Sequence, residues 1–177
     1  MSWLNSLFGK ETPVRATPEQ IAETWATVIA TNTSKLEIEL LALNLKPQSK
    51  ARFVIGCLLF SAFPFDVSLD IEFLAYGDVI RQRLRRRLFV DVQRATGAPA
   101  NSFSDFDAML TSKCIEYLEA WKTAEGGQDV LALGVAASRS IFGPHEPLFT
   151  LCHSLHVTAI ATLASLKGIG AKYQVVA

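Results

Sequence analysis

Apolar residues recur at three- and four-residue steps along most of this chain, which is the pattern of helices that bury one face. Thr17 and Gln20 form a capping box with a proline at the first helical position, so a helix is predicted to begin there. Ser34 and Glu37 repeat the box, which predicts a second start near Lys35. The side chains predicted to face inward are Ile21, Trp25, Val28, Ile29, Leu36, Leu40 and Leu43.

The middle of the chain is divided by prolines. Pro47 opens a helix whose run over residues 53–63 is apolar nearly all round, and Pro64 is predicted to end it. Asp66 then caps a long helix that extends to Thr96. We expect the helix over 53–63 to lie inside the fold because it has no polar face.

Three more helices are predicted in the second half. The first carries a stripe of core side chains and ends at the glycine pair 126–127. The stripe consists of Phe103, Phe106, Leu110, Cys114, Tyr117 and Trp121. Residues 129–142 form a small-residue helix around Gly134, and the last helix runs from Pro147 toward Gly168. Because 148–166 is apolar on two sides, we expect it at the bundle centre, in a subunit contact or along a ligand pocket.

These elements predict an all-α protein, a compact single-domain bundle of six to seven helices with a short N-terminal amphipathic arm. Strand signals are nearly absent and no internal repeat is visible. The predicted division is an arm and linker over 1–16 and a helical bundle domain over 17–177. The arm carries Trp3, Leu4, Leu7 and Phe8 on one helical face.

Two interpretations of the arm stay open, namely insertion at a membrane surface and docking on a protein surface. Only Lys10 and Arg15 lie nearby and Glu11 opposes them, so anionic lipid would attract the arm weakly. We therefore favour docking, either on the chain's own core or on a partner.

Composition limits the partners and the compartment. Lys plus Arg and Asp plus Glu both number 17, so the chain has no overall attraction to nucleic acid, which we regard as an unlikely partner. Cys57, Cys114 and Cys152 are an odd, widely spaced set that indicates free buried thiols. A reducing, cytoplasmic location is therefore expected. The uncharged run over 148–166 is long enough to suggest a membrane span, but its His, Ser and Thr residues favour a buried helix.

An arginine cluster is the most conspicuous charged feature. It could bind an acidic partner or an anion through bidentate guanidinium contacts. The acidic residues of the same predicted helix, and Glu19, Glu23, Glu116 and Glu119 elsewhere, offer the alternative of internal salt bridges. The cluster consists of Arg81, Arg83, Arg85, Arg86 and Arg87.

Histidines suggest a second site. His153 and His156 lie one turn apart, and Glu146 lies two turns before His153 on nearly the same face. This set could bind a metal or haem, or a histidine could be the polar anchor of an apolar pocket between the 53–63 and 148–166 helices. A histidine satisfied in the core or at an interface is the alternative, and we assign no cofactor.

Searches for catalytic motifs find no nucleophile elbow, phosphate-binding loop, dinucleotide fingerprint or metalloprotease motif. The sequence therefore favours a non-enzymatic interaction or adaptor protein, self-associating or bound to another protein, with the arginine face for an acidic partner. The second hypothesis is a sensor or carrier of a small apolar ligand, metal or haem.

Overall fold

Six α-helices account for most of the chain in the computed structural model, which describes residues 13–43, 45, 47–96, 103–127, 129, 131–144 and 148–176. A short strand precedes the helices, and a short 3-10 helix, η1, and a second strand follow them. The helices are α2 (Pro18–Ala42), α3 (Lys50–Glu72), α4 (Gly77–Thr96), α5 (Phe103–Glu125), α6 (Ala132–Phe142) and α7 (Phe149–Leu166). The others are η1 (Ile169–Lys172), β1 (Val14–Ala16) and β2 (Tyr173–Val175). The all-α bundle predicted from the sequence is confirmed.

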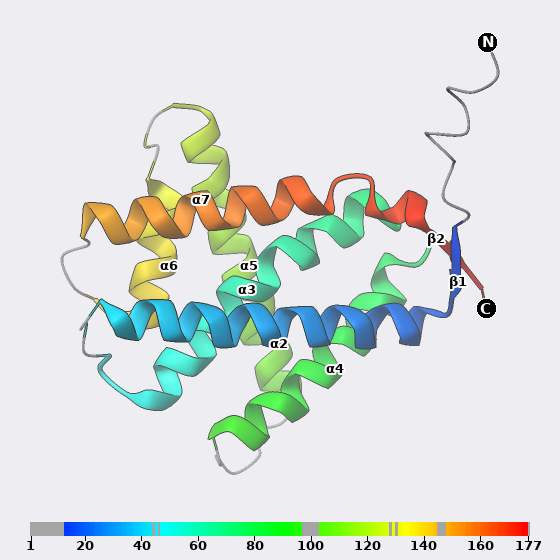
Figure 1. The fold of residues 1–177 in the computed structure, drawn as a ribbon, viewed down its shortest axis with the longest axis horizontal. Coiled ribbons are helices and arrows are strands. Elements are labelled where there is room, and N and C mark those ends of the chain that lie inside the picture. The colour runs from blue at the N-terminus through cyan, green and yellow to red at the C-terminus, as the bar shows by residue number, and fades with distance from the viewer. Residues whose placement is uncertain are drawn as a thin grey trace.

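Helix α3 is the element around which the others pack. It contacts α2, α4, α5, α6 and α7, and most of its side chains between Phe53 and Leu69 are buried. Figure 1 shows α2 and α7 running in opposite directions along one side of the molecule, with α3 behind the space between them. This central position is the one expected for a helix that is apolar nearly all round.

The predicted end of this helix at Pro64 is wrong, because α3 continues through Pro64 to Glu72. Proline in a helix interior costs about 3 kcal/mol through its missing N–H and its ring. Burial of the surrounding side chains outweighs that cost here, since Phe63, Pro64 and Phe65 are all buried. The long helix predicted from Asp66 is therefore divided, and its second part begins at Gly77 as α4.

The helix start predicted near Lys35 is also wrong, because α2 is continuous from Pro18 to Ala42. The capping box at Thr17 and Gln20 is confirmed, with both of its hydrogen bonds present. Within an existing helix the backbone N–H groups already have partners, so the second box has no free donors to cap. Two inward predictions fail as well, since Val28 is 40% exposed and Leu43 is 53% exposed.

A small parallel sheet joins the two ends of the described chain. Strands β1 and β2 pair with Val14 opposite Tyr173 and Ala16 opposite Val175. The sequence placed residues 14–16 in a linker, and strands this short leave little periodicity to detect. The Glu72 carboxylate accepts hydrogen bonds from the backbone N–H groups of Gly168 and Gly170, at 2.8 and 3.2 Å. The sheet is thus anchored to the end of α3.

Helices α6 and α7 approach each other closely at Gly134. A Cβ atom placed at Gly134 would overlap the backbone carbonyl group of Cys152 on α7. This close approach explains why a glycine, which is unfavourable within a helix, occurs in the first turn of α6.

We predict that Gly134→Ala lowers the free energy of unfolding by about 1–3 kcal/mol, as overpacked sites do. Urea denaturation measures the change. The matched control is Gly126→Ala after α5, where the nearest Cβ neighbour, the Lys122 carbonyl oxygen, lies at 3.4 Å. The control should change stability by about 0.5 kcal/mol or less. Equal stability of Gly134→Ala and the natural protein would contradict the close contact.

Candidate functional site

The arginine cluster is split between the interior and the surface. Arg85 is buried on α4, where its guanidinium lies 2.9 Å from an Asp66 carboxylate oxygen and 3.0 Å from one of Asp107. It also donates a hydrogen bond of 2.6 Å to the Thr111 hydroxyl. These contacts join α4 to α3 and α5. The salt-bridged alternative therefore describes Arg85, which has little surface left for a partner.

Arg81 is likewise held internally, between Asp66, Asp70 and Asp78. Three other members of the cluster remain exposed, and their contacts are longer. Arg83 lies 3.5 Å from Glu19 and Arg87 3.7 Å from Asp91, whereas Arg86 lies over the Phe103 ring at 5.3 Å. The side chains available to an acidic partner are Arg83, Arg86 and Arg87.

His153 and His156 both lie on α7. His153 is exposed and stacks on Phe149, with their ring centroids 6.1 Å apart. His156 is half-buried, and its Nδ1 has no hydrogen-bond partner among the described residues. Glu146 lies outside the described residues, as do Trp3, Leu4, Leu7 and Phe8 of the arm. Within the described ranges, no three His, Cys, Asp or Glu side chains are placed to hold a metal ion.

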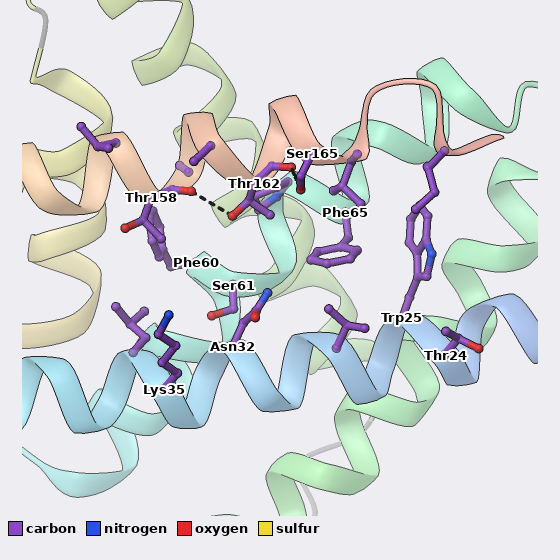
Figure 2. A pocket seen from close by; sticks show the side chains of 18 of the residues that line it. Thr24, Trp25, Asn32, Lys35, Phe60, Ser61, Phe65, Thr158, Thr162 and Ser165 are labelled. Atoms are coloured by element: carbon purple, nitrogen blue, oxygen red, sulfur yellow. Dashed lines mark hydrogen bonds between the residues drawn. The ribbon is translucent and has the colours of Figure 1, made fainter. Parts of the chain in front are cut away.

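A groove of about 710 Å³ runs between α2 and α7 on the described surface. Its floor is α3, which contributes Phe60, Ser61, Pro64 and Phe65. Figure 2 shows side chains from the three helices projecting into this space. The α7 wall runs from Val157 to Leu166, and the α2 wall consists of Thr24, Trp25, Val28, Asn32, Lys35, Leu36 and Glu39.

The floor of the groove is aromatic and rigidly packed. The Trp25 ring meets Phe65 edge to face, with centroids 5.3 Å apart, and meets Phe73 in the same way at 5.5 Å. Phe60 packs against the buried Tyr117 behind it. These aromatic side chains are covered by their neighbours, since Trp25, Phe60 and Phe65 are only 2–3% exposed, so the accessible apolar surface of the groove comes mainly from its walls.

The walls are less polar than their residue types suggest. The hydroxyl groups of Thr24, Thr158 and Thr162 each donate to a backbone carbonyl one turn earlier in the same helix. Ser165 donates to the Thr162 carbonyl (Figure 2). These hydroxyl groups need no donor partner in the groove, and the threonine methyl groups add to its apolar surface.

Helix α7 combines an apolar, uncharged sequence with an exposed position. It contains no Asp, Glu, Lys or Arg, yet only 28% of its residues are buried. The burial expected for the 148–166 run is therefore wrong over most of its surface, although Leu151, Leu155 and Ala159 face inward. Of the three roles that we expected for this run, the structure shows α7 as the wall of a groove.

Two described helices, α3 and α7, have the length and composition of a membrane span. This criterion alone is weak, because a core helix meets it equally well. Helix α3 meets it as the buried centre of the bundle.

The groove overlaps the pocket expected between the 53–63 and 148–166 helices, but neither histidine lines it. The contribution of α2 was missed. The available signal was an uncharged line in which Thr24, Val28 and Asn32 recur at four-residue steps. Because Val28 is apolar, periodicity alone assigned this line to the core.

The three cysteines are free and buried, as the sequence predicted. Burial raises the pKa of each thiol, for Cys114 from 9.0 to about 12. Thiols in this environment stay protonated and are poor nucleophiles near neutral pH.

No family model, curated protein or solved structure matches this chain. The interpretation of the groove therefore depends on its own geometry.

We predict that Arg85→Met lowers the free energy of unfolding by about 1.5–3 kcal/mol, the range for lost hydrogen bonds to charged groups. Asp107 loses its guanidinium partner, whereas Asp66 retains Arg81. The matched control Arg87→Met removes an exposed arginine and should cost less than about 1 kcal/mol. Equal losses in urea denaturation would show that Arg85 is not the internal link described above.

We also predict that stability falls as the pH rises above about 9, because unfolded thiols then release protons that the folded chain retains. Cys57 and Cys114 should each contribute a slope approaching about 1.4 kcal/mol per pH unit. The measurement is the free energy of unfolding between about pH 8 and pH 10.5 in reducing buffer. The Cys57→Ala, Cys114→Ala variant should show a shallower slope, whatever its stability at pH 8, and an unchanged slope would contradict the prediction.

Proposed function

We propose that this chain is a non-enzymatic interaction protein whose groove between α2 and α7 binds an uncharged, apolar-faced helix of a partner protein. The observation that carries the proposal is α7, an uncharged helix of which half the residues are exposed and which forms one wall of the groove. A concave surface whose walls carry apolar side chains and no uncompensated charge is typical of a binding site.

The shape of the groove supports a helical occupant. Two antiparallel helices form its walls and a third forms its floor, so a further helix would complete a packed layer (Figure 1). Such a helix would place side chains at i, i+3, i+4 and i+7 over the floor. Val28 and Val157 on the two walls, 40% and 48% exposed, would supply apolar contacts to such a helix.

The charges of the groove favour an uncharged occupant. Its α7 wall has none, and Lys35 and Glu39 on α2 lie 3.8 Å apart and compensate each other. A charged side chain lowered onto the floor would lose water without gaining an opposite charge. A partner helix with neutral residues on its binding face is therefore expected.

We predict that display selection from a library of helical peptides on this protein enriches sequences with neutral, apolar faces. The test variant Ala161→Glu places one carboxylate on the exposed α7 wall. It should weaken the selected peptides about tenfold or more in fluorescence anisotropy, equivalent to about 1.4 kcal/mol.

The matched control is Ile115→Glu, which adds the same charge at a 53% exposed position on α5 outside the groove lining. It should leave affinity unchanged. Equal weakening by both variants, or no enrichment at all, would contradict the proposed groove function. Selective binding of small apolar molecules instead would favour the carrier hypothesis.

The exposed arginines are a second candidate surface, for an acidic partner. Arg83, Arg86 and Arg87 keep exposed guanidinium groups with only long or aromatic contacts. Exposed charges outside the buried part of an interface affect mainly the association rate. The surface would therefore assist a partner that also occupies the groove.

A further inference from the structure

The groove does not end at the sheet. A second hollow, lined by Val14, Gln20, Gly168 and Lys172 among others, shares Thr24 and Tyr173 with the groove. Val14 is also the direct strand partner of Tyr173. The chain therefore enters the described part of the fold at the mouth of the groove.

We propose that residues 2–9 of the same chain occupy the groove between α2 and α7 and must be displaced before a partner binds. This inference rests on the proposed function of the groove, and it adds the regulation of that site. This segment is attached to β1, whose residues Val14, Arg15 and Ala16 line the connected hollow.

The chemistry of the segment matches that of the groove. Neither residues 2–9 nor the α7 wall contains an Asp, Glu, Lys or Arg residue. Trp3, Leu4, Leu7 and Phe8 recur at helical spacing, so one face could cover the aromatic floor. The polar residues Asn5 and Ser6 between the two apolar pairs would then face solvent.

The length of the segment also fits. Eight helical residues rise about 12 Å, which equals the rise along the α7 wall from Val157 to Ser165. Residues 10–13 could span up to about 13 Å between that helix and β1. Because pairing with Tyr173 fixes the position of Val14 at the start of β1, the attached segment stays at a high local concentration near the groove.

The experiment places a nitroxide on Ser6→Cys in the full chain and records methyl NMR spectra. The three native thiols are buried, so the introduced cysteine is the one expected to react. We expect loss of the methyl signals of Val28 and Val157, which line the groove, and retention of the signal of Ile115 on α5.

Two variants of the arm separate a specific contact from mere proximity. Leu4→Asp with Leu7→Asp should restore the Val28 and Val157 signals, because a charged face cannot cover the floor. The matched control Asn5→Asp adds one negative charge at a polar position, with the nitroxide kept at position 6, and should leave the loss intact. Loss that persists in the Leu4, Leu7 variant would overturn the inference.

A mixed sample decides between one chain and two. Spin-labelled chains without isotopes are mixed with isotope-labelled chains that lack the nitroxide. Signal loss in this sample would mean that the arm reaches a second copy and would overturn occupancy by the same chain, as would full retention of the groove signals in the first sample.

The outcomes for the arm and for the groove can be told apart. If the arm occupies the groove, the peptides that bind the groove should bind the Leu4→Asp, Leu7→Asp chain more tightly than the natural chain. Equal affinity for both chains, still reduced by Ala161→Glu, would overturn the inference and leave the groove function standing. Binding by neither chain would count against the groove function instead.

Discussion

The structure depends on the burial of α3, because a helix that is apolar nearly all round must be covered on every side. Five helices contact it and hold its Pro64 turn within the helix despite the missing N–H. Between α2 and α7 the covering leaves a groove over Phe60 and Phe65, although both rings are themselves only 2–3% exposed. The groove is thus the remaining opening over the most apolar element of the protein.

The buried charges of α4 belong to the same packing problem. Helix α4 can lie against α3 only if the arginines on its inner side meet acidic partners, because an unpaired buried charge is very unfavourable. Asp66 on α3 and Asp107 on α5 supply them for Arg85. Part of the conspicuous basic cluster is therefore a structural link, and the exposed remainder is what a partner could contact.

The proposed function and the proposed regulation come from one feature, the uncharged α7 wall. Covering the apolar part of this surface removes it from water, which is favourable. The chain has a neutral apolar segment near the groove mouth, and a partner helix of similar chemistry would compete with it. Partner binding would then require a difference in affinity large enough to release the arm.

The sequence alone determined the helical class, the cap at Thr17, the end of α5 at its glycine pair and the buried thiols, because these follow from local periodicity, hydrogen bonding and polarity. Only the tertiary structure decided that α3 continues past Pro64, that α2 is unbroken and that Val28 faces a groove. It also decided which arginines are internal. Each of these depends on what packs against a residue from a distant part of the chain, and local sequence carries no record of that neighbour.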